Sequence, residues 1–112
     1  MTITRNFNPE GSRYAYDCDL CSIKKGWAQI DTSQDAWYYG IWANPKRLMI
    51  FSYVEGDETL TTADSPEEFV AEIRRIKESN ETYGHAFHGI DPGIGPKLRR
   101  SFKELGLADL LH

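Results

Sequence analysis

Residues 36–54 read AWYYGIWANPKRLMIFSYV, and this stretch decides the fold. Aromatic and β-branched side chains dominate it on both sides of Asn44-Pro45, a dipeptide that is typical of turns. We therefore expect one strand over 36–43 and a second over 47–54. A connection this short favours antiparallel neighbours over a crossover.

The flanking segments extend this hairpin in both directions. GWAQIDT (26–32) is bounded by glycine and by DTSQD and predicts a strand before it, and ETLTTA (58–63) predicts one after it. Residues 26–63 then form an antiparallel β-meander of three to four strands. Residues 1–17 are polar and show no apolar periodicity, so we expect an N-terminal arm.

A helix is predicted over 65–79. Ser65 is placed as its N-cap, Pro66 fits the first helical position, and Glu68 completes a capping box. Acids occupy the first turn, and the expected last turn holds Arg74, Arg75 and Lys77, an arrangement that matches the helix dipole. The apolar stripe consists of Phe69, Val70, Ile73 and Ile76.

The remaining residues predict a loop over 80–95 and a helical segment over 96–112. Pro96 opens this segment, and Gly106 is suited to the C-cap. Its apolar face contains Leu98, Phe102 and Leu105. We expect a single α+β domain over 1–112, in which two C-terminal helices pack on one face of the meander.

Composition fits one globular domain. Of the 112 residues, 40% are hydrophobic, 12% aromatic and 27% charged. We find no signal-peptide pattern and no apolar run long enough to span a membrane, so we expect a cytoplasmic protein. The net charge of −4 argues against nucleic-acid binding over the whole surface, although acids gather in 55–73 and bases in 97–103.

Both faces of the predicted sheet carry apolar or aromatic side chains, whereas a solvated face is normally polar. One explanation is that the helices cover one face and the N-terminal arm covers the other. The second is an interface for a protein partner or a second copy, formed by Tyr38, Trp42, Phe51 and Tyr53. No pattern indicates a reaction class. The leading hypothesis is therefore a non-enzymatic protein-interaction domain.

The sequence holds one Cys-x2-Cys pair and one His-x2-His pair, formed by Cys18, Cys21, His85 and His88. Zinc takes four such ligands in tetrahedral geometry. The histidine spacing is shorter than usual, and ordinary packing of all four residues is the alternative. A zinc-stapled domain is therefore one alternative to the leading hypothesis, and no other cofactor is expected.

A second hypothesis comes from GIDPGIGPKLRR (89–100), in which a glycine-containing loop leads into a helix N-terminus. Free backbone N–H groups at such a position attract phosphate. The basic residues are Lys97, Arg99, Arg100 and Lys103. They predict a contact with phosphate or nucleic acid, against the alternative of a turn followed by a solvated basic face.

The segments GWAQIDTSQDAWYYGIWANP (26–45), PEEFVAEIRRIK (66–77) and GIDPGIGPKLRRSFKELGLADLLH (89–112) resemble a family of small uncharacterised bacterial proteins. The likeness covers residues 18 to 112. Members of that family are often encoded near plasmid- or phage-like genes. The resemblance implies a bacterial cytoplasmic setting and transfers no functional residue.

Overall fold

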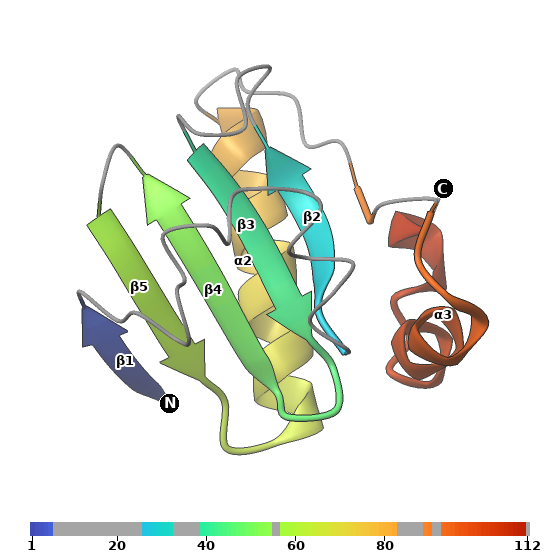
Figure 1. The fold of residues 1–112 in the computed structure, drawn as a ribbon. Helices are drawn as coiled ribbons and strands as arrows, with labels where there is room; N and C mark the ends of the chain where they lie inside the picture. The colour runs from blue at the N-terminus through green and yellow to red at the C-terminus, as the bar shows by residue number, and fades with distance from the viewer. Residues whose placement is uncertain (6–25, 33–38, 55–56, 83–88, 91–92, 112) are drawn as a thin grey trace.

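The computed structural model describes residues 1–5, 26–32, 39–54, 57–82, 89–90 and 93–111. Its fold is α+β, as predicted: within these residues it has a five-stranded antiparallel sheet and two α-helices (Figure 1). The strands are β1 (Thr2–Arg5), β2 (Ala28–Thr32), β3 (Tyr39–Asn44), β4 (Met49–Val54) and β5 (Asp57–Thr62). The helices are α2 (Pro66–Thr82), α3 (Pro96–Glu104) and the short 3-10 turn η2 (Ala108–Leu110).

The strand order is β1-β5-β4-β3-β2. Strands β2 to β5 are antiparallel neighbours in chain order, which confirms the predicted meander. The fifth strand corrects the expected count of three to four, because β1 pairs along β5. Its four residues were assigned to an arm, since a segment this short carries no periodic signal and its pairing depends on the neighbouring strand.

The β3–β4 turn forms where Asn44-Pro45 predicts it. Asn44 is buried, and its Oδ1 accepts hydrogen bonds from the backbone N–H groups of Lys46 (3.2 Å) and Arg47 (3.0 Å). This is the side-chain-to-backbone geometry that asparagine provides in turns. Leu48 still belongs to the turn, with a φ of 59°, so β4 begins two residues later than the predicted start at 47.

Helix α2 begins as predicted. The Ser65 Oγ accepts the N–H of Glu68 at 3.2 Å, as expected of an N-cap. The Glu68 Oε1 accepts the N–H of Asp64 at 3.2 Å, so the return bond of the predicted capping box goes to the residue before the N-cap instead. The helix continues to Thr82 rather than ending near 79. The expected basic last turn is therefore wrong, because the three bases lie inside the helix and its last turn has none.

Helix α3 ends in a Schellman motif. Gly106 has a φ of 82°, its N–H donates to the Lys103 carbonyl at 3.0 Å, and the N–H of Leu107 donates to the Phe102 carbonyl at 3.0 Å. Leu107 and Phe102 are both fully buried. At the end of η2, the Leu110 carbonyl accepts a hydrogen bond from the N–H of Ile90 at 2.8 Å, which ties the segment that precedes α3 in the chain to the segment that follows it.

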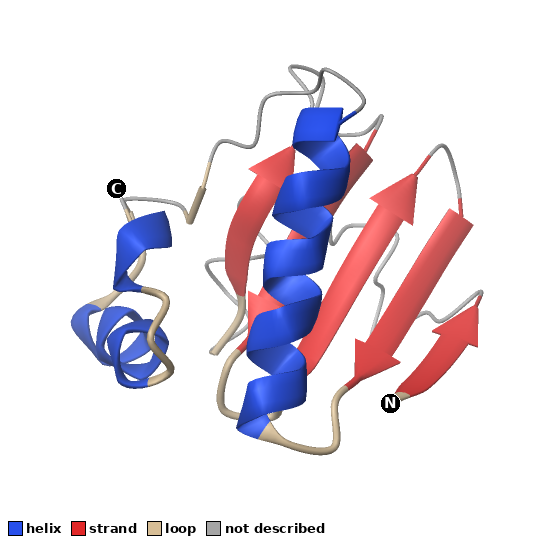
Figure 2. Cartoon of the chain, turned by 180° about the vertical axis from the view of Figure 1, so that it is seen from behind, coloured by secondary structure: helices blue, strands red, loops and turns tan. Residues whose placement is uncertain are grey.

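Two clusters of buried side chains lie on opposite faces of the sheet. The helix-face cluster unites α2, α3 and one sheet face; it includes Ile30, Ile41, Ile50, Phe69, Ile73, Ile90, Phe102, Leu107 and Leu110. Helix α2 crosses this face, and α3 lies beyond the β2 edge (Figure 2). The second-face cluster consists of Trp42, Phe51 and Leu60, with Trp27 and Met49 packed against it. Among the described helices, none has the length and apolar character needed to cross a membrane.

Candidate interaction surfaces

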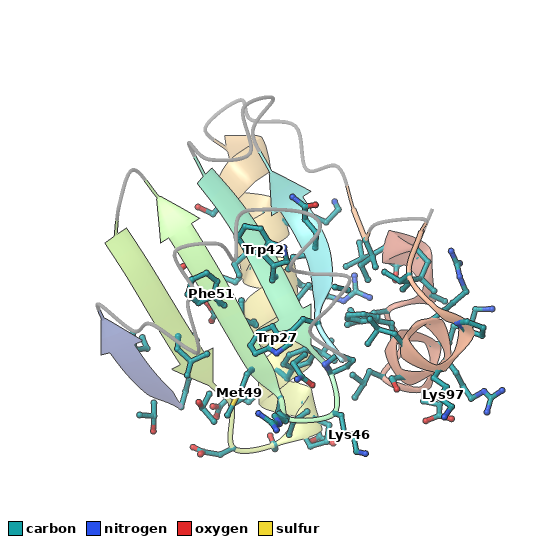
Figure 3. All side chains as sticks on the ribbon, viewed as in Figure 1. Trp27, Trp42, Lys46, Met49, Phe51 and Lys97 are labelled. Atoms are coloured by element: carbon teal, nitrogen blue, oxygen red, sulfur yellow. The ribbon has the colours of Figure 1, made fainter. Side chains whose placement is uncertain are left out.

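The aromatic side chains of the second face form one row across the sheet. Trp42 is the cross-strand partner of Phe51, and Phe51 is the partner of Leu60. The ring centroids of Trp42 and Phe51 lie 5.9 Å apart with planes tilted by 45° (Figure 3). This is ordinary geometry for an aromatic pair in a core.

The burial of this row bears directly on the interface predicted from the sequence. Trp42 is 1% exposed and Phe51 is 2% exposed, so neither presents contact area on the surface of the chain. Tyr38 lies outside the described residues, and Tyr53 is described only through its backbone in β4. The alternation of side chains along β3 and β4 therefore predicts correctly that Trp42 and Phe51 lie on the second face. It carries no information on what covers them.

Strand β1 carries the exposed apolar surface of the described residues. Its Ile3 is 54% exposed, and Met1, just before the strand, is 48% exposed. Among the side chains whose burial the structure describes, no other large apolar one is exposed to this degree. β1 forms one end of the sheet and pairs with β5 along one side. Such an edge presents unpaired backbone N–H and C=O groups to its surroundings.

The position of α2 explains why Ile3 is exposed. Ile3 pairs with Thr61, which pairs with Ile50, which in turn pairs with Ala43. Directly opposed residues share a face, so this row lies on the helix side of the sheet. Ile50 and Ala43 are buried there, whereas neither of the two described α-helices lies over β5 and β1 (Figure 2).

The amino group of Met1 attaches the start of β1 to the start of α2. Its nitrogen lies 2.6 Å from the Asp64 Oδ2 and 3.0 Å from the Glu68 Oε1. These hydrogen bonds, first to Asp64 and then to Glu68, raise the pKa of the amino group above its ordinary value of 8.0. Two carboxylates face one ammonium, so this end of β1 keeps an excess of negative charge.

The bases of α3 lie on its outer side. At 100° per residue, Arg99, Arg100 and Lys103 fall within an arc of about 100°, roughly opposite the partly buried Leu98. Lys97 and Lys103 are exposed, and Lys97 lies apart from the sheet (Figure 3). The N-cap of this helix is Gly95, which provides no side-chain cap. Arg100 is exposed as well, whereas Arg99 is half-buried, and the contact with phosphate or nucleic acid stays a prediction.

Arg74 of α2 attaches the segment that follows α3. Its Nη1 donates to the Asp109 Oδ2 at 3.0 Å, and its Nη2 donates to the Asp109 Oδ1 at 2.9 Å and to the Gly106 carbonyl at 3.1 Å. The two parallel bonds form the bidentate geometry that arginine favours with a carboxylate. They lower the pKa of Asp109 below its ordinary value of 3.8.

The four residues of the zinc hypothesis, Cys18, Cys21, His85 and His88, all lie outside the described residues. Within the part of the chain that the structure describes, no group of three or more His, Cys, Asp or Glu side chains is arranged to hold a metal ion. The zinc site stays a prediction from the sequence.

Within the described residues, the fold and these surfaces define an α+β domain whose sheet ends at β1 and whose outer helix, α3, is basic. No family model, no curated protein and no solved structure matches the chain. The resemblance to a bacterial family consequently stays a prediction. The β1 edge was missed from the sequence, and its only signal was one isoleucine within the β-branched run Thr2-Ile3-Thr4.

Proposed function

We propose that the chain is a small non-enzymatic interaction domain that binds another protein chain along the β1 edge. The observation that carries this proposal is the 54% exposure of Ile3 on a strand that pairs on one side only within the described residues. Added strands obtain affinity from backbone hydrogen bonds and specificity from alternate side chains. The proposal keeps the protein-interaction function expected from the sequence. It moves the contact surface to the β1 edge from the second face of the sheet, where Trp42 and Phe51 are buried.

Site-specific photo-crosslinking in the native host tests this function. A photoreactive residue replaces Ile3, and a control replaces Ala108, which is exposed on η2 far from β1 in sequence. We expect a covalent protein product from position 3 and none from position 108. Absence of a product at position 3 would overturn the proposal. The bacterial cytoplasmic setting belongs to the same proposal.

The outer face of α3 supports a second candidate function, a contact with nucleic acid. Its four bases would neutralise phosphates, and such binding weakens steeply as salt is raised. The excess of acids elsewhere restricts this contact to the helix.

This second candidate predicts that Arg99→Ala with Arg100→Ala weakens binding of a labelled oligonucleotide at low salt, by at least about tenfold, because two phosphate contacts are lost. Lys46→Ala with Arg47→Ala is the matched control, since it removes two exposed bases from the β3–β4 turn instead. Fluorescence anisotropy measures both. Equal weakening in the two double variants, or no binding by the unmodified chain, would contradict a specific role for α3.

A further inference from the structure

The β1 edge has properties that select its partner. Its backbone pairs with β5 through four successive register positions, from Thr2 opposite Thr62 to Arg5 opposite Thr59. On its other side, the described residues place no strand. One end carries the Asp64 and Glu68 carboxylates beside Met1, and the other end carries Arg5.

We propose that a second copy of this chain pairs its β1 antiparallel to the first, centred on Ile3, so that the two five-stranded sheets become continuous. This inference rests on the proposed function, since it names the partner of the β1 edge. In this register Ile3 lies opposite Ile3 of the second copy, Thr2 lies opposite Thr4, and Met1 lies opposite Arg5. Each copy contributes the same surface, as a two-fold symmetric interface requires.

The register places the two exposed isoleucines together. Because directly opposed residues share a face, both copies keep α2 on the same side of the continuous sheet. Ile3 lies on that side, where α2 does not reach (Figure 2). Pairing therefore brings the two Ile3 side chains next to each other between the two helices and removes them from water.

Charge favours the same arrangement. At the Met1 end, two carboxylates face one ammonium, at 2.6 Å for Asp64 and 3.0 Å for Glu68. The antiparallel register places position 5 of the second copy, an arginine in the sequence, opposite Met1, where negative charge is in excess. The two-fold symmetry repeats this Met1–Arg5 pairing at the other end of the paired strands. A parallel arrangement would instead place Arg5 opposite Arg5, which is unfavourable for like charges.

Sedimentation velocity of the full chain, measured over a concentration series up to the millimolar range, tests the dimer. We expect reversible dimerisation in the unmodified chain. Ile3→Lys should raise the dissociation constant at least about tenfold, because two like charges then lie directly opposite each other. Ala108→Lys adds the same charge on η2 and should leave dimerisation unchanged. A monomer throughout the series, or an Ile3→Lys variant that dimerises like the unmodified chain, would overturn the inference.

Disulfide trapping tests the register, in a Cys18→Ser and Cys21→Ser background whose circular dichroism is checked first. Opposed positions have Cβ atoms about 4.5–5.5 Å apart, near the distance of about 3.5–4.5 Å that a disulfide needs. We expect Ile3→Cys to oxidise to a covalent dimer at least about tenfold faster than Thr2→Cys, whose partner position is 4 rather than 2. Faster oxidation of Thr2→Cys would overturn the stated register.

Crosslinking from position 3 separates the failure of this inference from the failure of the proposed function. A product that contains only this chain, at twice its mass, supports the second copy. A product that contains a different protein overturns the second copy and leaves the interaction function standing. No product overturns both.

Discussion

Gly40 is a position at which one absent side chain shapes the second-face cluster. It lies two residues before Trp42 in β3, so both face the same side of the sheet. A Cβ on Gly40 would lie 2.7 Å from the Cζ3 of Trp42 and closer still to Cη2. The indole therefore lies back over Gly40, and a glycine inside a strand marks this close approach.

Gly40→Ala should accordingly destabilise the protein by about 1–3 kcal/mol, because the added methyl forces the buried indole out of its place. Chemical denaturation followed by far-UV circular dichroism measures the change. The control is the same substitution in a Trp42→Phe background, where the shorter ring relieves the clash and the cost should fall by more than half. Equal costs in both backgrounds would contradict the contact.

Single residues were predicted from the sequence where the cause is local. Ser65, Asn44 and Gly106 have side-chain or backbone requirements that depend on their immediate neighbours, and all three lie where the sequence places them. The exposure of Ile3 and the burial of Trp42 depend on how far α2 reaches and on what covers the second face. Neither is encoded in a neighbouring residue.

At the scale of elements, the bidentate bond from Arg74 to Asp109 holds the segment after α3 against α2. Arg74→Ala should speed hydrogen exchange at the amides of Leu110 and Ile90, since Ile90 donates to the Leu110 carbonyl. Hydrogen–deuterium exchange followed by mass spectrometry measures the exchange rates of these amides. Arg75→Ala is the control, because Arg75 bonds Glu72 within the same helix and should leave both amides unchanged. Equal exchange in the two variants would contradict the attachment.

The same pair has a defined pH dependence. The hydrogen bonds from Arg74 lower the pKa of Asp109 below 3.8 in the folded chain. The stabilisation is therefore present above 3.8 and is lost as the pH falls through the lower, folded value. The Arg74→Ala variant should lack this part of the acid sensitivity.

The amino group of Met1 predicts the opposite dependence at alkaline pH. Its pKa is raised above 8.0 by hydrogen bonds to Asp64 and Glu68, so its stabilising contribution is complete below 8.0 and is lost as the pH rises through the folded value. Thermal unfolding from pH 7 to 11, which extends roughly one unit below and three above the ordinary value of 8.0, should show a decrease in the melting temperature of the free-amine chain that its N-acetylated form lacks. Parallel curves for the two forms would contradict a role for the amine.

Elements were predicted with uneven success for a physical reason. The start of α2 is set by the Ser65 cap and by Pro66, and the start of α3 is set by Pro96, all of which act within one turn. The end of α2 at Thr82 and the pairing of β1 with β5 carry no such local residue. Tertiary contacts decide them, so the sequence placed the helix end too early and assigned β1 to an arm.

At the scale of the whole molecule, one sheet serves two clusters. Strands β3 and β4 place Ile41 and Ile50 in the helix-face cluster and place Trp42 and Phe51, their neighbours in sequence, in the second-face cluster. A change on one face must therefore disturb the backbone that supports the other. The alternation of apolar residues predicted this two-sided sheet from the sequence, although it did not show that the second face is buried.

Shared strands predict a single cooperative unfolding transition. Ile73 of α2 is fully buried in the helix-face cluster, so Ile73→Ala should cost about 2–5 kcal/mol through lost contacts and the cavity that remains. Urea unfolding is followed by circular dichroism, which reports α2, and by tryptophan fluorescence, which includes Trp27 and Trp42 at the second-face cluster. Ala71→Ser, on an exposed position of the same helix, should shift stability by at most about 0.5 kcal/mol.

In Ile73→Ala both signals should move to the same lower midpoint, because the second-face cluster cannot persist once the strands it shares with the helix face have separated. A fluorescence midpoint that stays at the unmodified value while the circular dichroism midpoint falls would mean that the two faces unfold independently.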